Sequence, residues 1–241
     1  MQLEGKIAIV TGASRGIGRE IALGFAAEGA DVTLCARDEI RLQQLAKEIT
    51  QRGRRAVVVK ADVTHVADVQ TVVDQTLESF GRIDVLCNNA GLDVHGEVDE
   101  IDPADWDNVI AVNLRGPFLC SRAVLPHMKN QNYGRIVDVS SGSAVNCSPG
   151  MAVYSASKAG LNAFSRTLAA EVREHDILVN AMSPGFLKTD MNPAGTRPPE
   201  DAVPTALLLA SLPTGGPSGK FYRFMKEVTV IPELSDLDWR N

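Results

Sequence analysis

The sequence predicts an α/β fold built on one doubly wound parallel sheet of about seven strands, with helices on both faces. Two observations support this. Short segments rich in β-branched residues alternate along the chain with longer segments of helical periodicity, which is the order of repeated strand–helix–strand units. The strand segments are also apolar at nearly every position, as expected of strands that helices cover on both sides. Right-handed crossovers between parallel strands then distribute the helices over the two faces.

The predicted elements follow one another from the N-terminus without a linker or an internal repeat. The expected strands are 6–11 (KIAIVT), 31–36 (DVTLCA), 55–60 (RAVVVK), 83–88 (IDVLCN), 134–140 (GRIVDVS), 176–182 (DILVNAM) and about 219–224. The expected helices are about 16–28, 39–51, 66–79, 104–130, 153–173 and 200–211. Gly29 and Gly53 end helical segments, as glycine often does, and Asp38 precedes one as an N-cap.

Length and composition favour a single globular domain over residues 1–241 and exclude several classes of protein. The chain has 44% hydrophobic and 22% charged residues, the ordinary balance of a protein with a sizeable core. A net charge of -6 argues against binding to nucleic acid or to an anionic membrane surface. The longest apolar runs, such as 32–36, are far shorter than a membrane helix, and the N-terminus lacks the apolar core of a signal peptide.

The cysteines and histidines do not predict a metal site. The four cysteines have no CxxC spacing and read as small apolar residues of a protein in the reducing cytoplasm. The four histidines have no ligand spacing. After residue 184 prolines become frequent, and a proline-rich segment at the carboxyl edge of such a sheet is a typical substrate lid. We therefore expect a lid at about 186–200.

A glycine-rich loop directly after the first strand predicts a dinucleotide site of the Rossmann type. The loop runs from Thr11 to Gly18 (TGASRGIG) and opens a helix. Its glycines permit a tight turn and a close approach of the backbone to a pyrophosphate, and the helix N-terminus offers free N–H groups. The residues expected to contact the cofactor here are Gly12, Ser14, Arg15, Gly16, Ile17 and Gly18.

The charges around this loop favour NADP(H) over NAD(H). An NAD site usually has a carboxylate at the end of the second strand, but this strand ends in Cys35-Ala36-Arg37. Arg37 and Arg15 together suit a 2′-phosphate dianion. Asp38 is more simply the N-cap of the next helix. After the third strand, Asp62 and Val63 are expected beside the adenine, and Asp62 is compatible with a second role as a helix cap.

Tyr154 and Lys158 form a candidate acid–base pair at the start of a strong helical pattern. Residues i and i+4 share one helix face, so the two side chains project together. A free tyrosine has a pKa near 10, and an adjacent ammonium with a cationic nicotinamide would lower this pKa by favouring the phenolate. The pair alone is weak evidence, because chance pairs with this spacing are common on helix surfaces.

With these motifs and others in the same order, the chain resembles the single-domain type of the short-chain dehydrogenase/reductase family. The shared motifs are TGASRGIG at 11–18, Asp62, Asn88-Asn89-Ala90-Gly91, Asn113, Ser141, Tyr154-Ser155-Ala156-Ser157-Lys158 and SerProGlyPheLeuLysThr at 183–189. The resemblance implies a catalytic tetrad of Asn113, Ser141, Tyr154 and Lys158. Ser141 would orient a ketone, Tyr154 would donate the proton, and Lys158 would tune Tyr154 and hold the nicotinamide ribose. Asn113, expected inside the helix 104–130, would bind a relay water through its backbone carbonyl.

The resemblance also extends the cofactor site and assigns Asn88 to tying neighbouring strands together. The further cofactor residues implied are Asn89, Ala90, Gly91, Pro184, Gly185, Phe186 and Thr189, beside Tyr154 and Lys158. Asp138 stands where the family often has asparagine, and its sequence context assigns it no role.

The substrate is the least determined feature. The expected pocket wall is moderately apolar and consists of Val94, Ser143, Ala144, Val145, Asn146, Phe186, Leu187 and Met191. This favours an NADPH-dependent carbonyl reductase acting on a small-molecule ketone or secondary alcohol. The runner-up is a 3-oxoacyl-(acyl carrier protein) reductase. Such enzymes carry basic residues where this chain has Asn132 and His175, although Lys129, Arg135 and Arg173 lie close by in the sequence. A third reading, from another class, is a catalytically silent NADP(H)-sensing protein.

The resemblance implies a homodimer or homotetramer formed through the helices at about 104–130 and 153–173. The spacing of Ser141 and Tyr154 leaves no room for the insertion found before the catalytic tyrosine in monomeric carbonyl reductases. The tail at 217–223 (PSGKFYR) departs from the usual ending of the core family and resembles carbonyl-reductase relatives.

Overall fold

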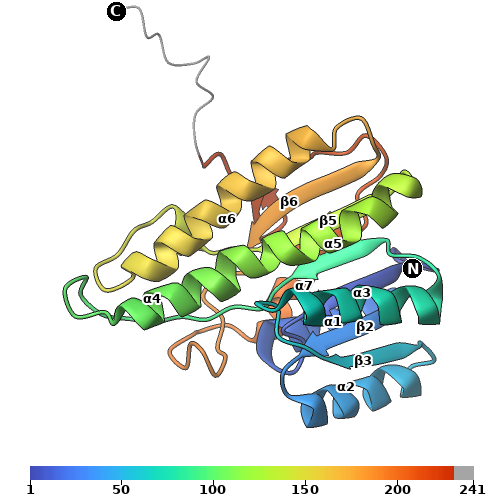
Figure 1. Cartoon of the computed structure of the whole chain (residues 1–241), viewed down its shortest axis with the longest axis horizontal. Helices are drawn as coiled ribbons and strands as arrows, with labels where there is room; N and C mark the ends of the chain where they lie inside the picture. Colours follow the sequence, from blue (N-terminus) through green and yellow to red (C-terminus); the bar gives the residue numbers. More distant parts are fainter. Residues whose placement is uncertain (231–241) are drawn as a thin grey trace, which may run out of the picture.

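The fold is an eight-stranded, almost entirely parallel sheet between two layers of helices, and the computed structural model describes residues 1–230 (Figure 1). The strand order is β3-β2-β1-β4-β5-β6-β7-β8, and only the β7–β8 pair is antiparallel. The strands are β1 (Ile7–Thr11), β2 (Asp31–Ala36), β3 (Ala56–Lys60), β4 (Val85–Asn88), β5 (Gly134–Val139), β6 (Ile177–Ser183), β7 (Phe221–Arg223) and β8 (Lys226–Glu227). The predicted doubly wound α/β fold is confirmed.

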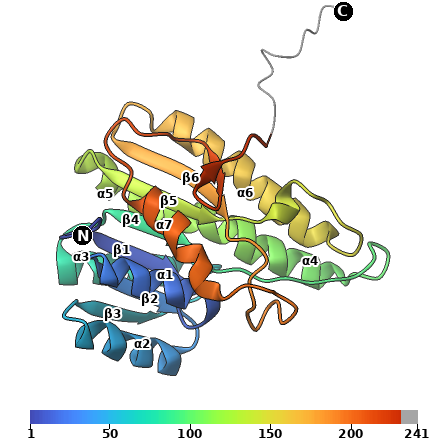
Figure 2. The same cartoon turned by 180° about the vertical axis from the view of Figure 1, so that it is seen from behind.

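Two helical layers cover the sheet, each with its own apolar core. Figure 2 shows α1 (Gly16–Ala27), α2 (Glu39–Gln51) and α7 (Val203–Ala210) on one face. The opposite face, toward the viewer in Figure 1, carries α3 (Val66–Phe80), α5 (Gly116–Asn130) and α6 (Ala152–Glu171). Among the described residues, no helix combines the length and apolar character needed to cross a bilayer.

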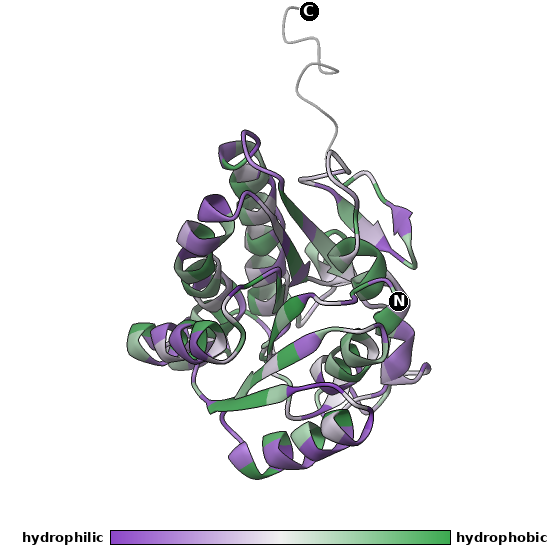
Figure 3. Ribbon diagram, turned by 90° about the vertical axis from the view of Figure 1, so that its right-hand side faces the viewer, coloured by the Kyte–Doolittle hydropathy of each residue, from purple (hydrophilic) through white to green (hydrophobic). Residues whose placement is uncertain are grey.

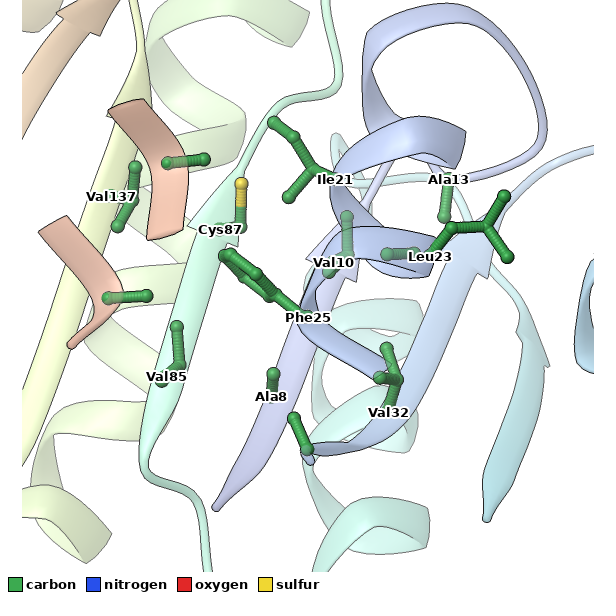
Figure 4. Packing of buried hydrophobic residues seen from close by; sticks show 14 of the residues in the cluster. Ala8, Val10, Ala13, Ile21, Leu23, Phe25, Val32, Val85, Cys87 and Val137 are labelled. Carbon is green, nitrogen blue, oxygen red and sulfur yellow. The ribbon is translucent and has the colours of Figure 1, made fainter. Parts of the chain in front are cut away.

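The sheet strands are buried on both faces because both layers press on them. Every residue of β1, β2, β4, β5 and β6 is buried. Figure 4 shows Phe25 of α1 lying over Cys87 and Val85 of β4, with Val137 of β5 beyond them. Burial of one such side chain contributes about 2 to 3 kcal/mol to stability. The continuous apolar runs of the sequence therefore correspond to the green strands at the centre of Figure 3.

The predicted continuous helix over residues 104–130 is wrong. The expected continuous helix 104–130 is divided into α4 (Pro103–Ile110), a single π-helical turn, η1 (Ala111–Arg115), and α5. A π turn leaves extra space in the backbone ladder and is frequent at functional sites. Asn113 lies in this turn with no exposed surface, so a solvent-facing asparagine in a regular helix is excluded.

The strand order of the sheet reverses between β1 and β4. β1 pairs with β2 on one side and β4 on the other, and the connections from these strands leave in opposite directions. In open parallel sheets, ligands bind beyond the carboxyl ends of the strands at this point. Thr11, Asn88 and Val139 are the last residues of β1, β4 and β5, so the loops that follow them form the candidate site.

Candidate active site

The glycine-rich loop after β1 is packed directly against the Asn89–Gly91 segment after β4. Gly12 has a φ of +66°, and a Cβ at this position would lie 2.8 Å from the Cα of Ala90. Asn89 Nδ2 donates to the carbonyl of Thr11 at 2.9 Å, and Thr11 Oγ1 accepts the backbone N–H of Ala90 at 3.1 Å. These contacts bring two predicted cofactor segments together and explain why the loop needs glycine.

The N-terminus of α1 fits a pyrophosphate. Arg15 occupies the N-cap position, its side chain makes no capping hydrogen bond, and the first turn of α1 contains no acidic residue. The first N–H groups of a helix have no intrahelical acceptor and carry partial positive charge. Gly16 adds no side chain in front of them, and its nearest neighbour across the loop is the methyl group of Thr189. The arrangement is therefore suited to an anionic group.

Two arginines converge on a single carboxylate at the entrance to this loop. The guanidinium of Arg15 lies 3.0 Å from Oδ2 of Asp190, and that of Arg41 lies 3.8 Å from the same oxygen. A 2′-phosphate is an anion that two such groups would bind well. Arg37 lies at the same strand end, 3.8 Å from Asp62. Sequence reasoning found Arg15 and Arg37 but missed Arg41, whose only signal is its place four residues after Arg37, in the first turn of α2.

Asp38 and Asp62 differ in how far they match their expected roles as caps. Asp38 is the N-cap of α2, and its carboxylate accepts the backbone N–H of Arg41, as expected. Asp62 does not cap α3, because the N-cap position belongs to His65. The Asp62 carboxylate instead accepts the N–H and the hydroxyl of Thr64 in the preceding turn, at 2.9 and 2.8 Å. The expected second role of Asp62 as a helix cap is therefore wrong. Val63, beside it, is buried.

Ser141 and Tyr154 are brought together from the end of β5 and the first turn of α6. The side chain of Tyr154 lies beside that of Ser141. Burial raises the pKa of Tyr154 to about 12; the Ser141 hydroxyl opposes this shift by stabilising the phenolate, and the nearby Asp93 carboxylate adds to it. The protein's own groups thus do not produce the lowered pKa that we expected from Lys158. Burial and Asp93 instead keep Tyr154 protonated, and a protonated phenol can act as a proton donor.

Lys158 is buried behind Tyr154. Its ammonium lies 5.8 Å from the centre of the Tyr154 ring and donates to the backbone carbonyl of Val139 at 2.8 Å. Burial lowers the pKa of Lys158 to about 8, and the negative charges of Asp138 and Asp93 oppose the shift. The separation from the ring explains why Lys158 does little to the pKa of Tyr154 through direct contact.

Asp138 has a structural place that the sequence did not reveal. It is fully buried in β5 and accepts hydrogen bonds from Asn88 Nδ2 at 2.8 Å and from Ser165 Oγ at 2.5 Å. Burial raises its pKa, and these two hydrogen bonds and the charge of Lys158 oppose the rise. Asn88 also donates to Ser121 of α5 at 3.3 Å. Asn88 therefore ties β4 to β5 as the resemblance implied, and Asp138 is the other half of the tie.

Asn113 anchors the segment after β4 through its side chain. Its Oδ1 accepts the N–H of Leu92 at 2.7 Å, and its Nδ2 donates to the Leu92 carbonyl at 2.8 Å and to Ser157 Oγ at 3.0 Å. A Cβ on Gly91 would lie 3.4 Å from Asn113 Oδ1 and 3.8 Å from Lys158 Nζ. All four predicted tetrad residues are therefore close to one another at the carboxyl end of the sheet.

The expected pocket wall is only partly formed by the predicted residues. Val94 and Ser143 are half-buried at the edge of the site, while Val145, Asn146, Phe186 and Met191 are exposed. Leu187 is wrong as a wall residue, because it is 2% exposed and packs in the core cluster of α1 and α7. Pro184 is buried at the end of β6, and Gly185 has a φ of +97°. Over residues 1–230 the structure contains no group of three metal-ligating side chains.

Comparison with known proteins agrees with this geometry. The short chain dehydrogenase family model matches residues 6–199. The chain belongs to the short chain dehydrogenase family. The 3-oxoacyl-[acyl-carrier-protein] reductase FabG of Thermotoga maritima is 40% identical over 207 residues, which cover 86% of this chain and 83% of that protein.

Two further members of the family are similar to this chain. The (2S)-[(R)-hydroxy(phenyl)methyl]succinyl-CoA dehydrogenase subunit BbsD of Thauera aromatica is 39% identical over 191 residues, which cover 79% of this chain and 77% of that protein. A short chain dehydrogenase of Burkholderia cenocepacia, solved in complex with NADP, superposes with a TM-score of 0.84 at 33% identity and covers 92% of this chain and 97% of that chain. The family is one of dehydrogenases and reductases, so the chain is an oxidoreductase.

Proposed function

We propose that this chain is an NADPH-dependent reductase that converts a 3-oxoacyl thioester into the corresponding 3-hydroxyacyl thioester. The observation that carries the proposal is the Ser141–Tyr154 pair, with Tyr154 holding its proton, at the same sheet edge as two converging arginines. Two of the relatives named above act, according to their names, on acyl thioesters, and a solved relative binds NADP. These names favour a thioester over the simple ketone that the pocket composition suggested.

Each residue of the site has a distinct task in this reaction. When bound, NADPH supplies a hydride to the carbonyl carbon. Ser141 orients the carbonyl oxygen, and Tyr154 donates its phenolic proton to that oxygen as charge develops on it. Lys158 keeps a positive charge behind the phenol below about pH 8 and would hold the ribose hydroxyls of the bound cofactor. Asn113 fixes the loop that carries Gly91, which would lie against the bound cofactor.

The surface around Asn132 and His175 bears on what carries the thioester. Asn132 has a φ of +49°, and its side chain accepts the N–H of Asp176 at 3.4 Å. Both residues follow the carboxyl ends of α5 and α6, whereas Tyr154 lies in the first turn of the 20-residue α6. At 1.5 Å per residue, the carboxyl end of α6 at Glu171 lies about 26 Å from Tyr154 along the helix. Asn132 is uncharged, and the exposed Arg173 nearby is paired with Glu174, so this surface favours a free or coenzyme-A-linked thioester over an acidic carrier protein.

The test is the initial rate of NADPH oxidation with an acetoacetyl thioester, with simple ketones and with diketones. Turnover of the thioester that disappears in Tyr154→Phe, while NADPH still binds, supports the proposal. Turnover of ketones but not of the thioester would instead support a carbonyl reductase. Tight NADPH binding with no turnover of any substrate would instead favour a nucleotide-sensing protein. A Tyr133→Phe variant is the matched control, because it removes a phenolic hydroxyl far from the tetrad, at the end of α5.

We also propose a homodimer formed through α5 and α6. Phe118 of α5 is 44% exposed and makes an edge-to-face contact with Phe164 of α6, with ring centroids 6.3 Å apart. Phe164 is partly buried against the core, so it backs the exposed ring of Phe118, and an exposed aromatic side chain supported in this way is typical of an interface anchor. Light scattering of Phe118→Glu beside the parent protein tests this.

Three of the four free cysteines are buried, which supports a reducing, cytoplasmic location.

A further inference from the structure

The two ends of the 186–200 segment meet close to the carboxyl edge of the sheet. Leu187 and Arg197 form an isolated β-bridge, and the N–H of Lys188 donates to the carbonyl of Arg197 at 2.7 Å. The base of the segment, which we expected to be a substrate lid, is therefore held together by its own backbone. What fixes this base against the rest of the molecule is a separate question, and the last hairpin of the sheet answers it.

The tip of the β7–β8 hairpin has an unusual backbone for its residue types. Arg223 pairs with Lys226, so Phe224 and Met225 form a two-residue turn, with φ of +50° and +61°. Such turns normally contain asparagine and glycine, because a Cβ is disfavoured at positive φ. The strain persists only where surrounding contacts fix the conformation. One such contact is the N–H of Met225, which donates to Oγ1 of the buried Thr205 in α7 at 3.0 Å.

The ring of Phe224 provides the other contacts, and it touches both ends of the segment. A Cβ on Gly185 would lie 3.0 Å from two carbons of this ring, so the ring rests on the backbone just before the segment begins. The guanidinium of Arg197, at the other end, lies 4.4 Å from the centre of the same ring. Arg197 is itself oriented by an ion pair with Asp201 at 2.7 Å. One side chain of the hairpin therefore joins the two ends of the segment.

Gly185 is close to the predicted tetrad both along the chain and in space. It follows Ser183, the last residue of β6, by two positions. A Cβ on Gly142, the residue directly after Ser141, would lie 3.8 Å from Oγ of Ser183. The ring of Phe224 therefore supports a turn that begins beside Ser141, and a displacement of this turn would change the geometry of the site.

We propose that Phe224 is a positioning residue, which holds the turn at Gly185 and the base of the 186–200 segment in place beside Ser141. The strained turn directs the ring toward Gly185 and Arg197, and the contacts made there compensate for the strain. The inference rests on the proposed function only in requiring that the site reduces a carbonyl. One of its tests needs no substrate, so the two can fail separately.

The first test is limited digestion with trypsin. Lys188 is exposed within the segment, whereas Arg197 is followed by a proline and is not a site for this protease. Cleavage after Lys188, followed by mass spectrometry, reports how often the segment opens. In Phe224→Leu, which removes the aromatic ring but keeps an apolar side chain, this cleavage is expected to be about two- to fivefold faster. That factor corresponds to the loss of one exposed cation–π pair.

The second test is turnover of the best carbonyl substrate with NADPH. In Phe224→Leu, kcat is expected to fall about tenfold, because a small displacement of the site wall misplaces the reacting groups. The Kd for adenosine 2′,5′-bisphosphate, which has the 2′-phosphate but no nicotinamide, should stay constant. Phe224→Tyr keeps the ring and should behave as the parent protein in both tests. Phe80→Leu is the matched control, because Phe80 lies 4.8 Å from the guanidinium of Arg55 at the end of α3, and it should change neither.

The double variant Phe224→Asn, Met225→Gly separates positioning from stability. It gives the turn its preferred residues, so its melting temperature should be no lower than that of the parent protein, while kcat falls at least as far as in Phe224→Leu. If kcat falls only together with the melting temperature, Phe224 is a packing residue and the proposal is overturned. In an active parent protein, an unchanged kcat or an unchanged cleavage rate in Phe224→Leu overturns it as well. If the parent protein reduces no carbonyl, the proposed function fails and the cleavage rates alone decide on Phe224.

Discussion

Removing Arg41 tests whether the converging arginines select NADPH. Arg15 and Arg41 reach the same oxygen of Asp190 at 3.0 and 3.8 Å, and their side chains are 63% and 49% exposed. At this exposure the attraction between an arginine and an anion is close to its value in water, about 1 kcal/mol for two unit charges 4 Å apart. A 2′-phosphate carries nearly two charges, so each arginine contributes about 2 kcal/mol to NADPH binding.

Arg41→Ala is therefore expected to raise the Kd for NADPH about 30-fold, because 1.4 kcal/mol corresponds to a factor of ten. The Kd for NADH should be unchanged, since NADH has a hydroxyl at this place. Fluorescence titration of both nucleotides at low and high salt measures the effect, which should shrink with salt. Arg52→Ala, an exposed arginine at the other end of α2, is the control. Equal losses for NADPH and NADH, or no loss at all, would refute the reasoning.

Three further predictions concern buried groups of the site. Asp138→Asn should increase stability at neutral pH and flatten its pH dependence, which urea unfolding from pH 4 to 8 measures. Burial raises the pKa of Asp138, so the folded chain binds more protons than the unfolded chain above the ordinary value of 3.8, and stability falls as pH rises through the folded pKa. Gly18→Ala should lower the free energy of unfolding by about 1 to 3 kcal/mol, since its Cβ would collide with Asn89 Nδ2 and the Gly12 carbonyl; a thermal melt that matches the parent would contradict this. The reduction rate should fall as pH rises through about 8, where the ammonium of Lys158 is lost, and a rate that is constant from pH 6 to 10 would exclude that dependence.

The sequence predicted the fold well because both signals it used are local. Continuous apolar runs such as 6–11 require burial on both faces, and the TGASRGIG loop requires a tight strand-to-helix turn. The helix prediction failed at 104–130. The π turn at Asn113 depends on contacts with Leu92 and Ser157, which lie elsewhere in the chain. Periodicity contains no information about such a turn.

For the site, residue types were predictable and environments were not. Tyr154 and Lys158 were found by their spacing and Ser141 by the family resemblance. Arg41 and Asp93 were not found, because their importance depends on Asp190 and on the loop after β4, which the fold places beside other groups of the site. Leu187 was placed in the pocket for its apolar character, which fits a core equally well. A single sequence distinguishes these environments only where a motif fixes the neighbours.

The burial and charges around the tetrad keep the Tyr154 phenol protonated, which is the state from which it donates a proton during reduction. Burial and Asp93 keep the proton on Tyr154, and burial weakens the hold of Lys158 on its proton. The raised pKa of Tyr154 keeps its phenol protonated, and the lowered pKa of Lys158 makes its proton easier to release. A developing alkoxide needs both, because it takes the phenol proton and the phenol must then be reprotonated. Oxidation needs the phenolate instead, and here it would depend on added positive charge from an oxidised nicotinamide. Loss of the Asp93 charge should therefore lower the pKa of Tyr154, so the oxidation rate of Asp93→Asn should rise at lower pH than that of the parent protein.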